Sequence, residues 1–303
     1  MLGVAVIWGV NIPIMKIGLE QLDLYVFNAI RLTISAVVLV LFAWRELRRG
    51  IKPKPGLTFK QLLLFGLVMS AMYQILFLLG VSHTTSGNTA LIISTVPMWT
   101  ALLARVFLHE KLRILAWSGL TIALVGTVIV ALQKGDVSTG LDQFWGNLFI
   151  LGAALLWAGG TVYSRPLLTR ISPVQLSASA AVIALPVHLA IAAGRYESSL
   201  PSLQSVDLWL IILYSGILSS GLALPMWNLG VRHAGAAHAA VIQNLVPLVA
   251  IIAAWLTRGE PVTQAQILGG SLILSGVIMV RRGRHAVLVG VPERDAEAVA
   301  ECD

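Results

Sequence analysis

The stretch "IISTVPMWTALLARVFLHE", from Ile92 to Glu110, places Pro97 inside an almost unbroken apolar run. A proline in a helix interior removes one backbone hydrogen bond and clashes with the preceding turn. The stretch "VIQNLVPLVAIIAAWLTRGE", from Val241 to Glu260, repeats the arrangement around Pro247. In both stretches the proline follows a valine and stands thirteen positions before a glutamate, and the two prolines are 150 residues apart. This spacing indicates a chain built from two related halves.

Other motifs recur at almost the same spacing. A shift of 150 residues brings "LGVSH" at 79–83 onto "LGVRH" at 229–233, and a shift of 149 brings Trp8 in "AVIWG" onto Trp157 in "ALLWA". Agreement at one nearly constant shift indicates an internal duplication. The matches beyond the prolines are Glu110, Gly119 and Gly126 with Glu260, Gly269 and Gly276.

The composition is that of a protein embedded in a lipid bilayer. Of 303 residues, 57% are hydrophobic and 12% charged, and the mean hydropathy is +0.85. Soluble domains carry about a quarter charged residues. Crossing the hydrocarbon takes about 20 mostly apolar residues. Segments of this kind occur at residues 2–18, 24–44, 60–81, 88–108, 113–132, 146–164, 172–192, 207–229, 236–257 and 262–280.

Each half therefore contains five predicted spans. Because five is an odd number, the second half must lie in the membrane in the opposite orientation, an architecture typical of secondary transporters. We predict an all-α membrane protein with ten transmembrane helices as two inverted five-helix repeats. The repeats are expected at 1–132 and 146–282, with a flexible cytoplasmic tail at 283–303.

The basic residues predict which ends of the spans face the cytoplasm. Lysine and arginine accumulate in cytoplasmic loops. Fifteen of them flank one set of connections and four the other, so both termini are predicted to be cytoplasmic and the net charge of +7 does not indicate nucleic-acid binding. The fifteen are Arg45, Arg48, Arg49, Lys52, Lys54, Lys60, Arg105, Lys111, Arg113, Arg165, Arg170, Arg232, Arg281, Arg282 and Arg284; the four are Lys16, Lys134, Arg195 and Arg258.

The chain resembles the EamA-type permeases, the ten-helix branch of the drug/metabolite transporter superfamily. The motifs that carry the resemblance are "AVIWGVNIPIMK", "FNAIRLTISAVVLV" and "LIISTVPMWTALLARVFLHEKL" with its second-half echo, and it covers about residues 4–282. It implies export of small molecules, with amino acids and related metabolites foremost, across the bacterial inner membrane. It also implies a central cavity lined by the third, fourth, eighth and ninth helices, with contributions from the first and sixth.

The prolines have two interpretations. Interrupted helices at matching places in both halves point to a binding site at the middle of the membrane, where irregular backbone must be covered by protein or by a water-filled cavity. A proline can also simply bend a helix for packing. The mirrored placement of Pro97 and Pro247 beside polar residues favours the cavity.

Polar and aromatic residues within the spans are the candidates for substrate contact, because polar groups are costly inside a membrane. Aromatic rings with uncharged amides suit an amphipathic or zwitterionic substrate; serine and threonine often only bond their own helix. The predicted substrate-binding residues are Trp8, Asn11, Tyr73, Gln74, Thr95, Trp99, Trp157, Tyr163, Tyr214, Trp227, Gln243 and Asn244.

Arg31 is a basic residue well inside a predicted span. It can bind a substrate carboxylate, or it can snorkel toward the interface or bond neighbouring carbonyl groups. The sequence slightly favours the second interpretation. His188 and His238 have no partner in the repeat and are weaker candidates.

The paired glycines of the fifth and tenth spans allow close helix contact. We expect these spans to pack together or against the bundle, away from the substrate path, while a dimer contact is the alternative. The protein is thus predicted to be a monomer or a homodimer.

The lack of acidic residues at the centres of the spans argues against several functions. No predicted span carries Asp or Glu near its centre, whereas proton-coupled export of cationic drugs commonly uses such a carboxylate. Neutral or zwitterionic substrates are therefore favoured, with proton-coupled efflux of amphipathic drugs as the alternative. An intramembrane enzyme would need an acid pair, a metal motif or a nucleophile with its base. None is found in the spans, so no enzymatic activity, cofactor or metal is predicted.

Overall fold

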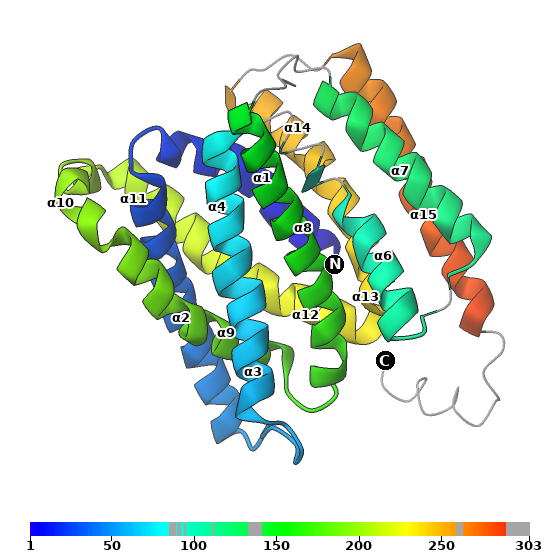
Figure 1. Cartoon of the computed structure of the whole chain (residues 1–303), viewed down its shortest axis with the longest axis horizontal. Helices are drawn as coiled ribbons and strands as arrows, with labels where there is room; N and C mark the ends of the chain where they lie inside the picture. Colours follow the sequence, from blue (N-terminus) through cyan, green and yellow to red (C-terminus); the bar gives the residue numbers. More distant parts are fainter. Residues whose placement is uncertain are drawn as a thin grey trace.

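The computed structural model describes residues 1–84, 89, 92–93, 95–110, 112–132, 141–258 and 263–288, and the regular elements of this part are helices. The helices lie side by side in one bundle (Figure 1). By length and composition, seven described helices can cross a membrane, and three shorter apolar helices cover Val96–Phe107, Ile114–Ile129 and Gln264–Val280. Together they account for the ten predicted spans, which confirms the all-α, ten-helix class.

The first half contains five helical rods, where a rod is one helix or a run of consecutive helical segments. The third rod consists of three such segments. The five rods are α1 (Leu2–Leu19); α2 (Leu24–Arg48); α3 (Phe59–Gly66), η1 (Leu67–Met72) and α4 (Tyr73–His83); α6 (Val96–Phe107); and α7 (Ile114–Leu132).

The second half repeats this plan. Its rods are α8 (Leu141–Leu167); α9 (Pro173–Ala192); α11 (Val206–Leu213), η4 (Tyr214–Leu222) and α12 (Ala223–Ala234); α13 (Ala236–Val241), η5 (Ile242–Leu245) and α14 (Val246–Arg258); and α15 (Gln264–Leu288). Short helical turns η2 (Ala193–Arg195), α10 (Tyr196–Ser199) and η3 (Ser202–Gln204) follow α9. The last helix extends into the predicted tail, whose residues 289–303 lie outside the described part.

Helix contacts reproduce the sequence repeat. α1 packs on α14 as α8 packs on α6, and α2 packs on η4 as α9 packs on η1. The pairs α7–α15 and α2–α9 each join equivalent helices of the two halves, and α6 packs on α13, so the fourth rod contacts the ninth. The contacts α1–α14 and α2–η4 thus each have a counterpart in the other half, as a duplicated chain would give.

The paired glycines bring α7 and α15 together, which confirms that the fifth and tenth spans pack on one another. A Cβ atom on Gly119 would lie 2.6 Å from the Gly276 carbonyl oxygen, and one on Gly126 would lie 2.5 Å from that of Gly269. Only residues without side chains allow this backbone approach. The pair runs along one side of the bundle (Figure 1).

Each of the two prolines stands in the first turn of an α-helical segment, and the segment with Pro247 continues α13 and η5 without a break. Pro97 stands in the first turn of α6, and Pro247 in the first turn of α14, directly after the 3₁₀ turn η5. A proline in the first turn costs no hydrogen bond, because the amide there has no partner within the helix. In the ninth rod the 3₁₀ turn η5 interrupts the α-helical pattern directly before the segment that contains Pro247.

The third and eighth rods each contain a π-helical segment, which the sequence did not predict. In η1 the amide of Tyr73 donates to the carbonyl of Val68, and in η4 the amide of Ala223 donates to that of Leu218. A shift of 150 residues brings one bond onto the other. Such wide turns are rare and frequently mark functional sites.

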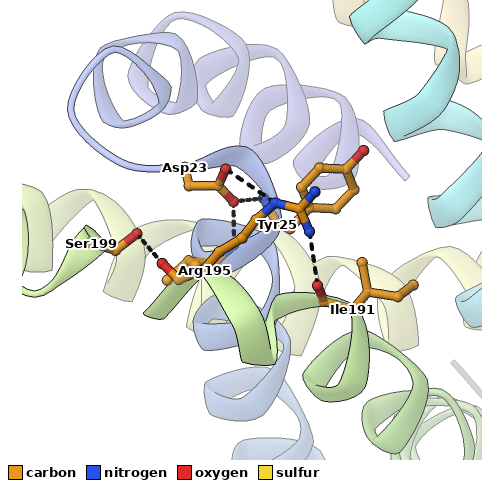
Figure 2. A network of polar contacts seen from close by, with 6 residues as sticks. Asp23, Tyr25, Ile191, Arg195 and Ser199 are labelled. Atoms are coloured by element: carbon orange, nitrogen blue, oxygen red, sulfur yellow. Dashed lines mark hydrogen bonds and ion pairs between the residues drawn. The ribbon is translucent and has the colours of Figure 1, made fainter. Parts of the chain in front are cut away.

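Contacts between connections agree with the predicted alternation of the chain. At the end predicted to face outward, Asp23 caps α2 and lies 3.7 Å from the Arg195 guanidinium, which covers the Tyr25 ring at 4.4 Å (Figure 2). Arg195 also donates to the Ile191 carbonyl at 3.1 Å. This network connects the loop between α1 and α2 with the C-terminal end of α9.

Candidate functional site

A cavity of about 50 Å³ lies in the bundle between α2, the third rod, α8, α9 and the eighth rod. A water molecule needs about 10–15 Å³ of such volume, so the cavity holds a few waters and must widen to admit a larger molecule. Its lining combines three aromatic residues with uncharged polar groups and one histidine. These are Phe65, Trp157, Trp227, Ser35, Ser70, Gln74, Ser177, His188, Ser220 and Asn228, with Leu32, Met69, Ala180, Ala181, Ala184, Leu185 and Leu224 completing the wall.

Both π-helical segments reach the cavity and offer backbone carbonyl groups to side chains. The Trp8 indole donates to the carbonyl of Ser219 in η4 at 3.0 Å, and His188 Nε2 lies 2.8 Å from the carbonyl of Ser70 in η1. The carbonyl can only accept, so Nε2 carries the proton. The irregular backbone is thus held at the cavity from both halves.

An aromatic cluster borders the cavity. Trp8 lies 5.6 Å from both Trp157 and Trp227, between ring centroids, and these two lie 5.9 Å apart, while Tyr73 lies 4.9 Å from Trp157. Trp157 and Trp227 are 7% and 1% exposed, and their indole N–H groups have no hydrogen-bond partner within the described part of the chain. Two buried donors at one cavity are suited to a ligand rich in acceptors.

Arg31 lies directly behind the cavity wall. Its Nε donates to Asn28 Oδ1 at 2.9 Å, and its two terminal nitrogens lie 3.4 Å from Ser220 Oγ and 3.4 Å from Gln74 Oε1. Asn28 in turn lies 3.4 Å from His188 Nδ1. The ion pairs in which both residues are described are Arg165–Glu110 and Arg195–Asp23, so the partners of Arg31 among the described residues are all neutral.

Other predicted site residues hold the helices around the cavity without lining it. Asn11 Oδ1 accepts from Ser215 Oγ at 2.7 Å, and the Tyr214 hydroxyl donates to the Ile7 carbonyl at 3.2 Å. Both bonds connect α1 with η4. Tyr163 packs against the main apolar core.

The candidates of the fourth and ninth rods do not line this cavity. Thr95 donates to the Ile92 carbonyl at 2.6 Å and accepts from the Trp99 indole at 3.0 Å, so both residues bond locally. Asn244 is buried, and Gln243 Oε1 is buried without a partner in the described part. The structure thus gathers Gln74, Trp157 and Trp227 on the wall, with Trp8, Tyr73 and Arg31 beside them.

Sequence reasoning missed the contribution of α9. This helix places Ser177 and His188 on the wall, and Asn228 of α12 donates to Ser177 Oγ at 2.9 Å. The available signal was a histidine within a span, which by itself does not reveal the direction of its side chain. The absence of a partner in the repeat counted against His188 although it reaches the cavity.

Comparison with known proteins gives a consistent result along the chain. A model of the EamA-like transporter family matches residues 1–132 and 144–282. The fold is also found in a crystal structure with a TM-score of 0.78 and 16% identity, covering 92% of this chain and 96% of the other.

Curated relatives match over nearly their full length. The uncharacterized transporter YoaV of Bacillus subtilis is 27% identical, with 92% of this chain and 94% of the relative covered. The probable terminal-alkyne amino-acid exporter of Streptantibioticus cattleyicolor is 25% identical, with 91% and 90% covered. The uncharacterized inner membrane transporter YedA of Escherichia coli is 28% identical, with 92% and 89% covered.

Proposed function

The chain belongs to the EamA-like transporter family, and from this premise we propose that it exports small neutral or zwitterionic metabolites by alternating access. Amino acids with apolar or aromatic side chains are the foremost candidates. The bacterial inner membrane is the proposed location, since one relative is an inner membrane transporter. A second relative is named a probable amino-acid exporter, which supports the substrate class.

The observation that carries this proposal is the composition of the cavity wall from both halves. The first half contributes α2 and the third rod, and the second half contributes α8, α9 and the eighth rod. Rocking of one half against the other therefore changes the volume and the access of the cavity. At about 50 Å³ the cavity is narrower than an amino acid, as expected of a state that must open.

The chemistry of the wall fits such substrates. Trp157 and Trp227 offer apolar surface to a side chain, while the hydroxyl and amide groups bond a polar backbone moiety. His188 is the ionisable side chain among the described lining residues, which supports proton-coupled efflux of amphipathic drugs as the second candidate. The distribution of the basic residues predicts that both termini are cytoplasmic, so export would run from the Glu110 end of the bundle to the Asp23 end.

The test is flux in proteoliposomes of the purified protein. Neutral, aromatic, acidic and cationic amino acids and one cationic drug are each measured with and without an imposed pH gradient. We expect saturable movement of neutral or aromatic amino acids that does not depend on the gradient. Gradient-driven movement of the cationic drug alone would favour the second candidate and direct attention to His188. Movement of none of the compounds would refute both.

A further inference from the structure

The guanidinium of Arg31 reaches the middle of the eighth rod. One of its contacts is Ser220, which stands fourteen residues from each end of the membrane-spanning stretch Val206–Ala234. A snorkelling arginine would instead extend toward the closer end of its own helix. The contact therefore argues against snorkelling, because the charged head turns toward the interior.

A cation in this position needs an anion. Buried charges are normally paired, because an unpaired one loses its hydration without compensation. Among the described residues, three side chains accept hydrogen bonds from the Arg31 guanidinium, namely Asn28, Gln74 and Ser220, and none carries a charge. Within the described residues no carboxylate lies at ion-pair distance from it. The described part of the protein thus offers positive charge at the cavity without a counter-ion of its own.

Hydrogen bonds on the side away from the cavity fix the orientation of the Arg31 guanidinium. The Nε bond to Asn28 is the shortest of the three at 2.9 Å, and Asn28 lies against His188, which is held by the Ser70 carbonyl. Asn28 and His188 are 2% and 3% exposed. This buried chain of bonds leaves the two terminal nitrogens for other partners. A planar guanidinium presented in this way matches a carboxylate, with two parallel hydrogen bonds.

The partners on the cavity side are easily exchanged. Gln74 and Ser220 both line the cavity, and each lies 3.4 Å from a terminal nitrogen, near the limit of a hydrogen bond. A carboxylate would make shorter, charge-assisted bonds in their place. The indole N–H groups of Trp157 and Trp227, which have no partner among the described residues, provide further donors on the same wall.

We propose that Arg31 is the carboxylate-binding residue of the cavity, with Gln74 and Ser220 yielding to the ligand. This inference rests on the proposed function and narrows it to amphiphiles that carry a carboxylate beside an apolar or aromatic body. Because the described wall has no acidic residue, the ammonium group of an amino acid contributes little to recognition. An aromatic carboxylic acid without an amine should therefore bind, whereas the matching amine should not.

The experiment compares four ligands of one shape in proteoliposomes and in thermal-shift binding to the purified protein. They are phenylalanine, 3-phenylpropanoate, phenylalanine amide and phenethylamine. We expect the first two to bind and compete, and the two without a carboxylate to bind about ten- to hundredfold more weakly, as the loss of charge-assisted bonds implies. Equal binding of acid and amide to the wild type would overturn the proposal, while the transport function would stand.

Variants separate binding from a merely structural role. Arg31→Gln should lose the preference for acid over amide, and Arg31→Lys should keep part of it. Gln74→Glu places a carboxylate beside the guanidinium, so the variant should melt at a higher temperature yet no longer bind phenylalanine. Arg195→Gln, a change of the same kind outside the cavity, should keep the preference. Retention of the preference in Arg31→Gln would refute the proposal.

If Arg31→Gln does not fold, two measurements still test the proposal. These are the comparison of ligands in the wild type and the melting and binding of Gln74→Glu. If no compound moves or binds in the wild type, the proposed function itself fails, and this outcome is distinct from equal treatment of acid and amide.

Discussion

The carboxylate of Glu110 receives the guanidinium of Arg165 at 2.7 Å and also accepts the backbone amides of Ala236 and Ala237 at 3.0 and 3.2 Å. It thereby joins the end of α6, in the first half, to α8 and to the first turn of α13, in the second half. The side chain of Glu110 is 10% exposed, and a negative charge at a helix N-terminus is favourable. This contact closes one end of the bundle.

The first prediction concerns this closure. Glu110→Gln removes the charge and leaves one oxygen for three donors, so the free energy of unfolding should fall by about 1–3 kcal/mol. Thermal unfolding of the purified protein measures the effect. Glu20→Gln is the control, because Glu20 is exposed. Equal melting of the two variants would show that the contact contributes nothing to stability.

The pairing of α7 with α15 leads to the second prediction. In Gly276→Ala the new Cβ atom would meet the Gly119 carbonyl oxygen at 2.4 Å. Backbone must shift to relieve such a contact, so we expect a loss of about 1–3 kcal/mol in unfolding free energy. Gly159→Ala is the matched control, since its Cβ atom has no neighbour within 4 Å. A Gly276→Ala variant as stable as that control would contradict the tight pairing.

The third prediction uses the two repeat-related tryptophans. The Trp8 indole bonds the Ser219 carbonyl, whereas the Trp157 indole has no described partner. Trp8→Phe should therefore lower the unfolding free energy by about 1–2 kcal/mol, because it leaves a buried carbonyl unsatisfied. Trp157→Phe removes the same ring volume but breaks no described hydrogen bond, so it should cost less stability than Trp8→Phe while weakening substrate binding. Melting curves and saturation of flux report the two effects, and the reverse pattern would disprove the assignment.

The fourth prediction concerns the candidates that the cavity does not include. We expect Gln243→Ala, Asn244→Ala and Trp99→Ala to fold and to transport more slowly, because the fourth and ninth helices should border the substrate path once the halves move. Flux through each variant in proteoliposomes is the measurement. Normal transport in all three would remove these residues from the path.

Membrane orientation is the subject of the fifth prediction. A cysteine in the connection 45–60, such as Lys52→Cys in a chain with Cys302→Ser, should resist an impermeant thiol reagent in intact cells and react after permeabilisation. Glu20→Cys, in the connection predicted on the opposite side, should react in intact cells. The opposite result for the pair would invert the topology.

Much of the architecture can be predicted from local features of the linear sequence. The number of spans depends on runs of apolar residues, and the two halves follow from matches such as Trp8 with Trp157 and Pro97 with Pro247. The contact of α7 with α15 was one of the alternatives that the glycines at matched spacing indicated. These properties depend on local composition or on the repeat, so a single sequence contains them.

The cavity itself depends on the tertiary structure. Asn28 and His188 are 160 residues apart, and Arg31 and Ser220 are 189 apart, yet they form one polar cluster. Side-chain direction and packing between distant helices decide whether Arg31 turns inward and where helices widen into π turns. They also decide which of two equivalent tryptophans keeps a donor without a described partner. The sequence by itself determined the ten spans and their duplication, because hydrophobicity and repetition are properties of the chain. Only the tertiary structure decided which polar groups meet. The repeat relates the helices of the two halves, but equivalent side chains in the two halves pack differently.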